Sequence, residues 1–188
     1  MKEEIVPELD DEFARSVSSH QKTIGALREA VRIDLEAQRA RENRHRLEER
    51  VVDAVLATHH FASPEGLVAR EVAQRVGRVR AEIMRGGVDP DAVSEPFTKL
   101  AQEMRPAAER AVRRALILEA IAQREEIAVS DTEVDAEVER IAEESGRAPQ
   151  AVRSLLQRGG DLDGLRLGLR EARVLKLLVE QADIHPQP

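Results

Sequence analysis

Apolar residues recur at helical spacing at both ends of a stretch that runs from Thr23 to about His60. Spacings of three and four put such residues on one helical face, and the two sets are Ile24, Leu27, Val31 and Leu35, followed by Leu47, Val51, Val55 and Leu56. Between them, residues 36–46 contain nothing larger than alanine to bury. A helix that is polar all round in its middle typically joins two packing clusters across water. We therefore predict one long helix, here called the strut (residues 23–62), with an ordinary surface helix as the alternative.

The next apolar blocks predict a hairpin of two helices. Ser63 and Pro64 form a start signal, a capping hydroxyl followed by a proline at the first helical position. A valine-rich stripe at intervals of three and four follows, formed by Val68, Val72, Val76, Val79 and Ile83. Gly86 and Gly87 predict the end of this helix, and residues 89–90 predict the start of the second, antiparallel helix of the hairpin.

Two prolines predict that the second half of this hairpin is divided into two helical segments. Pro96 and Pro106 each lack the backbone donor that a helix interior requires. We therefore predict a short segment up to about Arg105 and a separate helix from Pro106 onward. Residues 115–121 are apolar on more than one face and predict the most buried helix of the chain.

Three further helices complete the chain. Ser130 and Glu133 form a capping box, in which each side chain bonds a backbone donor of the other residue, and they predict a helix that ends by Gly146. A shorter helix follows up to residues 159–160, and Asp161 is expected to cap the last helix. Because short turns make consecutive helices antiparallel neighbours, we predict an all-α fold, an elongated multi-helix body with the strut and two projecting helical arms. The predicted ranges are an N-terminal linker with a short helix (1–22) and a single all-α domain (23–188), with arms at about 63–120 and 121–172 and a closing helix up to 183.

Composition narrows the class of protein. Aromatic residues make up only 2% of the chain, which indicates slender packing by aliphatic side chains, and there is no cysteine for a disulfide or a thiolate site. No apolar run is long enough for a signal peptide or a membrane span, so we expect a cytoplasmic protein with no membrane partner. The net charge of −7 argues against nucleic acid as a partner. The arginine-rich run 39–50 is interrupted by glutamates and is expected to be a solvated face.

The sequence offers no recognisable reactive or metal-binding constellation. Its five histidines do not pair with one another or with glutamate at metal-binding spacing. Asp161 and Asp163 resemble the start of a calcium loop that lacks its later ligands. We therefore expect no catalytic residue, no metal and no cofactor, and hence no enzyme.

Apolar stripes on projecting arms point to a binding surface. Exposed apolar patches of more than a few hundred Å² normally mark interaction sites, and aliphatic faces without directional polar groups bind apolar polypeptide with little sequence preference. The candidate client-binding residues are Val72, Val76, Val79, Ile83, Met84, Val138, Ile141, Leu155 and Leu156. The alternative is that these stripes form the core of each hairpin.

Four stretches of the sequence resemble a known family. They are residues 6–14 (VPELDDEFA), 23–28 (TIGALR), 108–113 (AERAVR) and 126–138 (EIAVSDTEVDAEV). In this order they resemble the C-terminal domain of bacterial trigger factor over nearly the whole chain. The resemblance implies an all-α body whose two arms form a cradle that shields unfolded or nascent chains without ATP. The family's ribosome-docking loop and its FKBP-type isomerase domain are missing from this sequence. Neither ribosome binding nor proline isomerisation is therefore implied, and we expect the chain to be a cut fragment.

The leading hypothesis is an ATP-independent chaperone module that binds exposed hydrophobic segments of unfolded or nascent polypeptides between two arms. The alternative is a structural or adaptor protein that forms a homodimer, or binds a partner, through its long helix. A sustained heptad would support that alternative, and the apolar pattern fails in residues 36–46. A periplasmic chaperone and isomerase of related build is a third interpretation, which the missing signal peptide weakens.

Overall fold

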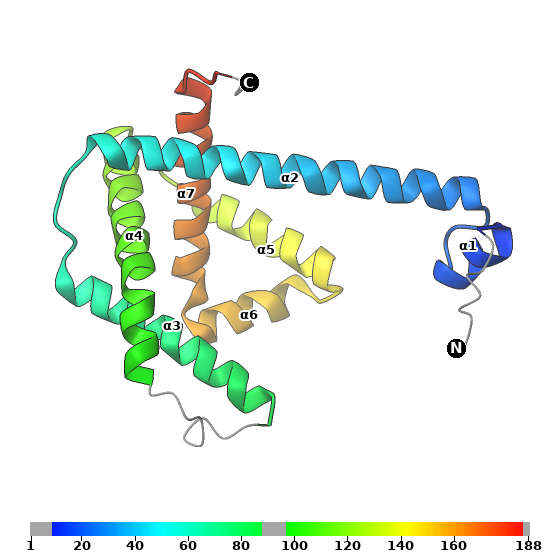
Figure 1. Cartoon of the computed structure of the whole chain (residues 1–188), viewed down its shortest axis with the longest axis horizontal. Coiled ribbons are helices and arrows are strands. Elements are labelled where there is room, and N and C mark those ends of the chain that lie inside the picture. The colour runs from blue at the N-terminus through cyan, green and yellow to red at the C-terminus, as the bar shows by residue number, and fades with distance from the viewer. Residues whose placement is uncertain (1–8, 88–96, 186–188) are drawn as a thin grey trace, which may run out of the picture. The chain divides into compact units, whose positions relative to one another are not determined.

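Every regular element in the described residues, 9–87 and 97–185 of the computed structural model, is an α-helix (Figure 1). In chain order the helices are α1 (Asp11–Val17), α2 (Ile24–Thr58), α3 (Glu65–Arg85), α4 (Phe97–Arg124), α5 (Asp131–Ser145), α6 (Pro149–Gly159) and α7 (Asp161–Gln181). The predicted all-α class is confirmed. The chain divides into two compact units, residues 1–49 and 50–188.

The first unit holds α1 and most of α2. Thr23 caps α2 as predicted, since its Oγ1 accepts a hydrogen bond from the backbone N–H of Ala26 at 3.2 Å. The predicted packing at this end is only partly found, because Val31 and Leu35 are 47% and 59% exposed. Every side chain from Val31 to Arg46 is exposed, so the middle of α2 faces water as its polar sequence predicts.

The second unit is organised around an apolar cluster to which α2, α4 and α7 contribute. Its buried members are Val52 and Leu56 of α2, Leu118 and Ala122 of α4, and Val174 and Leu175 of α7. Arg113 of α4 also reaches the end of α2, where its Nη2 donates to the carbonyls of Leu56 and His59 at 3.4 and 3.2 Å. A cation at these otherwise unpaired carbonyls stabilises a helix C-terminus.

The start of α3 differs from the prediction. Pro64 is itself the N-cap residue, with φ −60° and ψ 120°, and no side chain caps the helix. The Ser63 hydroxyl is buried without a hydrogen-bond partner. The Pro64 carbonyl instead accepts the N–H groups of Leu67 and Val68, at 3.0 and 3.2 Å. The predicted turn at residues 89–90, and Pro96, lie outside the described residues.

The predicted break at Pro106 is wrong, because α4 runs unbroken from Phe97 to Arg124. Pro106 is exposed, so the carbonyl that loses its helical partner faces solvent, which can satisfy it. On the opposite face, Leu100 and Met104 before the proline and Ala108 after it are half-buried or buried. The continuous apolar face therefore outweighs the loss of one hydrogen bond.

The second hairpin begins as predicted. Ser130 and Glu133 form the complete capping box, and Gly146 ends α5 in the left-handed conformation. The expectation that Asp161 caps the last helix is wrong. Gly160, at φ 73°, ends α6 and is also the N-cap of α7, which leaves Asp161 as the first residue of α7 with no side-chain capping bond.

Candidate functional site

An open groove of about 560 Å³ lies between α3 and α4. Its lining residues are Ala69, Val72, Ala73, Val76, Gly77 and Arg80 of α3, with Ala101, Gln102 and Arg105 of α4. The small residues of α3 recur every four positions and so share one helical face, and a side chain at Gly77 would meet open space. The groove can therefore bury apolar groups of a second molecule, and its lining among the described residues contains no carboxylate.

The valine stripe of α3 supplies both the core of this hairpin and the wall of the groove. Val68 is buried with Ala108 and Val112 of α4, and Val72 packs against them from the groove side. Further along α3, Val79 and Ile83 are half-buried. Met84 is 56% exposed. The structure thus leaves all five predicted residues of α3 at least partly accessible.

The predicted residues of the second hairpin divide differently. Val138 is 2% exposed and is packed with Ala142 and Val152. The structure corrects the expectation of an open surface at this position, because Val138 forms the core between α5 and α6. Ile141 and Leu156 pack against that core, and Leu155 of α6 is 53% exposed.

An ion pair and a cation–π contact border the groove. Arg105 pairs with Glu65 across α3 and α4 at 2.6 Å, and this hydrogen bond lowers the pKa of the Glu65 carboxyl below its ordinary value. The Arg80 guanidinium lies 5.7 Å from the centre of the Phe97 ring. These contacts fix charged side chains beside an apolar wall.

Neither metal-binding clusters nor membrane-spanning helices occur among the described residues. No group of three or more His, Asp or Glu side chains that could hold a metal ion occurs in the part of the chain that the structure describes. Among the helices described, none is long and apolar enough to cross a membrane.

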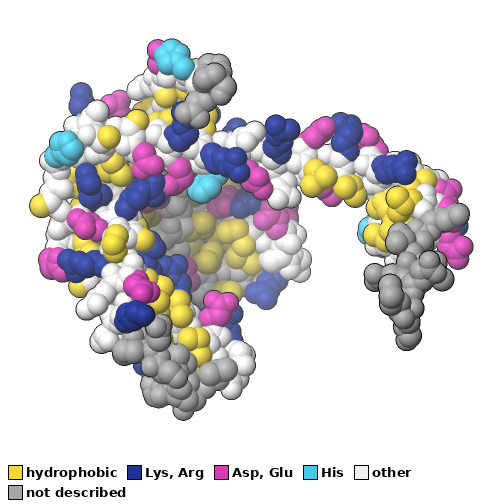
Figure 2. Space-filling model, in the orientation of Figure 1, with side chains coloured by type: hydrophobic (Ala, Val, Ile, Leu, Met, Phe, Trp, Pro, Cys, Tyr) yellow, Lys and Arg dark blue, Asp and Glu magenta, His cyan; other side chains and the backbone are white. Residues whose placement is uncertain are grey.

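Sequence reasoning missed three features of the exposed surface. Leu67, Leu167 and Ile33 are 37%, 48% and 52% exposed. Figure 2 shows hydrophobic side chains on the surface of the first half of α2. Ile33 is out of phase with the stripe used to define the helix face, which is why it was not selected. The small residues of α3 that open the groove carry a recognisable signal, the four-residue spacing of Ala69, Ala73 and Gly77.

Comparison with known proteins adds the family. Residues 23–180 match the family described as the C-terminus of bacterial trigger factor protein (TF). The chain belongs to the trigger factor C-terminal family. It is 33% identical over 183 residues to trigger factor of Koribacter versatilis, and 37% identical over 183 residues to trigger factor of an Anaeromyxobacter strain. These alignments cover 97% and 96% of this chain but 42% of each relative, so the chain spans about two fifths of their length.

A solved structure of trigger factor domains from Thermotoga maritima shares the fold, with a TM-score of 0.57 at 23% identity. The match covers 76% of this chain and 84% of that one. The trigger factor C-terminal fold predicted from the sequence is thereby confirmed. Membership of the trigger factor family does not favour the alternative of a structural or adaptor protein.

Proposed function

We propose that this chain is an ATP-independent chaperone module, which binds exposed apolar segments of unfolded or nascent polypeptides in a cradle bordered by its two helical hairpins. The observation that supports this most directly is the open groove of α3 and α4, whose wall includes Val72 and Val76 and whose lining, as far as the structure describes it, contains no carboxylate. A surface of this kind gains free energy mainly from apolar burial, which is non-directional. It therefore suits clients that share apolar character and no common sequence.

The separation of the two hairpins supports the same proposal. Among the described helices, the backbone of α3 approaches α4 and that of α5 approaches α6, while no helix of one hairpin closely approaches a helix of the other. Met84 is exposed on α3 of the first hairpin, and Leu155 is exposed on α6 of the second. A flexible client could thus contact both hairpins at once.

Binding through such contacts is weak at each site. A Val or Leu side chain contributes about 1.5–3 kcal/mol when it is fully buried, and association itself costs at least about 4 kcal/mol. Several contacts are needed before a client stays bound, and loss of a few releases it. Release then requires no ATP, which agrees with what is general for the family, as does action in the cytoplasm.

The proposed contact set contains eight of the nine candidates, Val72, Val76, Val79, Ile83, Met84, Ile141, Leu155 and Leu156. Val138 is left out because it is buried. The binding role of the other eight remains a prediction.

Aggregation of an unfolded client tests the proposal directly. A chemically unfolded protein is diluted into buffer with or without this chain, and light scattering is followed over time. The chain should suppress scattering in proportion to its concentration. The double variant Met84→Asp/Leu155→Asp should require roughly tenfold more protein, because a charge opposes apolar burial. Both side chains are more than half exposed, so the fold should be retained, which circular dichroism checks.

The matched control is Gln74→Asp/Gln157→Asp, which adds the same charge at exposed polar positions of the same two helices. It should behave like the unsubstituted chain. If the unsubstituted chain fails to suppress aggregation, the chaperone proposal is wrong. If both double variants keep full activity, the chaperone role stands and these binding positions are wrong.

A further inference from the structure

Three arginines on one side of α7 hold the connector between α4 and α5 (residues 125–130). They are Arg166, Arg170 and Arg173, here called the arginine ladder, and their spacing of four and three puts them on one helical face. Each donates to a different carbonyl of the connector: Arg166 Nη1 to Val129 at 3.2 Å, Arg170 Nε to Ile127 at 2.8 Å, and Arg173 Nη1 to Ala128. Three successive carbonyls are therefore bound by a single helix.

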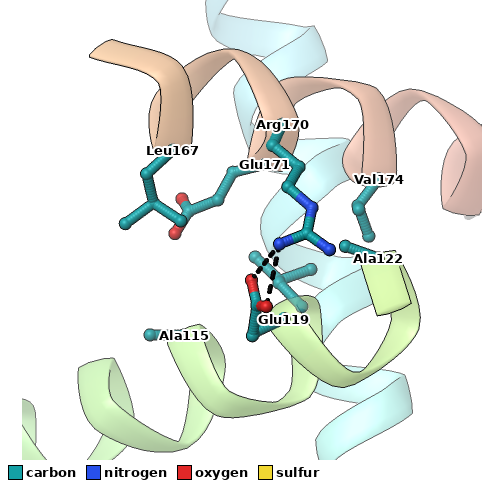
Figure 3. A pocket seen from close by; sticks show the side chains of 8 residues that line it. Ala115, Glu119, Ala122, Leu167, Arg170, Glu171 and Val174 are labelled. Atoms are coloured by element: carbon teal, nitrogen blue, oxygen red, sulfur yellow. Dashed lines mark hydrogen bonds and ion pairs between the residues drawn. The ribbon is translucent and has the colours of Figure 1, made fainter. Parts of the chain in front are cut away.

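Each member of the ladder also pairs with a carboxylate of a neighbouring helix. Arg170 Nη1 donates to both oxygens of Glu119 on α4 at 2.8 Å, as Figure 3 shows. Arg166 pairs with Asp131 at 2.5 Å, and Arg173 pairs with Glu133, both in the first turn of α5. The ladder thus joins α7 to the last part of α4 on one side and to the start of α5 on the other.

The connector itself adopts a conformation that an unconstrained chain disfavours. Glu126 has a φ of 53°, the left-handed region in which glycine is usual. The next N–H, of Ile127, closes the end of α4 by donating to the Ala122 carbonyl at 2.8 Å. Ile127 packs against the central cluster and Val129 is buried, while their carbonyls face the ladder. A strained backbone persists only where its surroundings determine it.

We propose that the arginine ladder is an ionic hinge clamp: by binding the connector and the acids beside it, it sets the direction in which the α5–α6 hairpin leaves α4. When the clamp is weakened, the connector loosens and the hairpin samples a wider range of directions relative to α4, limited by Leu162 and Leu165 of α7, which also pack against its core. The hairpin stays intact, because the buried residues of that core, Val138, Ala142 and Val152, do not include the ladder. The proposal is independent of chaperone activity.

Distances between spin labels test this in the full chain, which contains no cysteine to interfere. Labels at Ala120→Cys on α4 and Ser154→Cys on α6, both exposed positions, report the direction of the hairpin. Labels at Ala136→Cys and Ser154→Cys lie within the hairpin and report its integrity. Arg170→Gln should broaden the first distance distribution and leave the second unchanged. Amide exchange in residues 127–134 should become about tenfold faster, since charge-assisted hydrogen bonds are the strong ones.

The matched control is Arg140→Gln, which also removes one arginine that pairs with glutamates, here Glu137 and Glu144 of its own helix α5. It should leave both distance distributions unchanged. Arg170→Lys should give an intermediate width, because lysine keeps the charge but lacks the planar fork that reaches a carbonyl and a carboxylate together.

Raising the salt concentration tests the clamp without any substitution. At about 1 M salt the screening length falls to roughly 3 Å, so the first distance distribution of the unsubstituted chain should broaden and the second should stay narrow. The proposal is overturned if Arg170→Gln and 1 M salt both leave the first distribution unchanged. Equal broadening in Arg140→Gln would overturn it too, because the effect would then be general to ion pairs of this hairpin.

Discussion

The two hairpins of residues 50–188 are attached in different ways. In the first, α4 is a 28-residue helix that carries both the hairpin core, at Ala108, and the central cluster, at Leu118. In the second, α5 and α6 have 15 and 11 residues and are reached through a non-helical connector. The first hairpin thus continues a stiff helix with apolar burial at two places along it. The second is attached to α7 by the charge-assisted contacts of the ladder with the connector and by the packing of Leu162 and Leu165 against the hairpin core.

The surfaces of the two hairpins differ for a related reason. Small residues on α3, such as Ala73 and Gly77, cannot fill the space beside α4, so valines next to them line an open groove. In the second hairpin, Val138 and Val152 meet across a short interface and close it. Valines at the same helical spacing therefore form a groove wall in one hairpin and a core in the other. What decides between these outcomes is the partner on the facing helix: Val152 of α6 covers Val138, whereas small residues of α3 leave the space beside α4 open.

The largest expected effect comes from the cluster that anchors α4. Leu118 is 1% exposed and packs among α2, α4 and α7, so Leu118→Ala should lower the free energy of unfolding by about 2–5 kcal/mol, through lost burial plus a cavity. Urea denaturation measures it. Amide protection should fall in both hairpins, because α7 carries the ladder and α4 the first hairpin. The control Leu167→Ala, at a 48% exposed position of α7, should cost much less. Equal losses would contradict the central role of this cluster.

A smaller loss of folding free energy is expected at Val138, in the core of the second hairpin, and a still smaller one at Val76, in the groove of the first. Val138→Ala removes two methyl groups from a residue that is 2% exposed, and should cost roughly 2 kcal/mol. Val76→Ala removes the same groups from the half-buried wall of the groove and should cost clearly less. Urea denaturation of both variants gives the difference. Amide protection lost on Val138→Ala should be confined to α5, α6 and the first half of α7, where Leu162 and Leu165 pack against the same core. A larger loss for Val76→Ala would mean that the groove is closed in solution.

The helix boundaries and the buried positions differ in how well the sequence predicts them. Boundaries that depend on local side chains are predictable, as the capping box at Ser130 and the turn at Gly146 show. Boundaries that depend on burial are not, since Pro106 signals a break that the continuous apolar face of α4 overrides. The burial of Val138 depends on its partner Val152 in α6, which periodicity within α5 cannot reveal.

The sequence does not predict the arginine ladder, for another reason. Its spacing is visible in the sequence, but the same spacing is typical of any solvated helix face. The partners that give it a role lie 35 to 51 residues away along the chain. They include three backbone carbonyls, which leave no trace in the side-chain pattern.

The smallest expected effect is a difference in acid sensitivity. The hydrogen bond from Arg166 lowers the pKa of Asp131 below its ordinary 3.8, and hydrogen bonds from Gln123 and then Arg170 lower that of Glu119 below 4.5. A carboxyl with a lowered folded-state pKa stabilises the fold above its unfolded pKa, and this contribution is lost as pH falls through the folded pKa. As the pH falls below the ordinary pKa values of Asp131 and Glu119, the connector should therefore lose stability and loosen.

Amide exchange from neutral pH down to about pH 3, corrected for the intrinsic rate, measures this difference between the hairpins. In the described part of the α3–α4 hairpin, Glu65 is a comparable carboxyl, since the hydrogen bond from Arg105 lowers its pKa. The buried core of that hairpin, Val68, Ala108 and Val112, does not titrate. Protection in residues 127–134 should thus fall first, and protection around Val68 later. Arg166→Gln should remove the part of this acid dependence that comes from Asp131, because Asp131 then loses the partner that lowers its pKa, while the part that comes from Glu119 stays. Loss of protection in both hairpins at one pH and to one extent would mean that ionic contacts hold them equally.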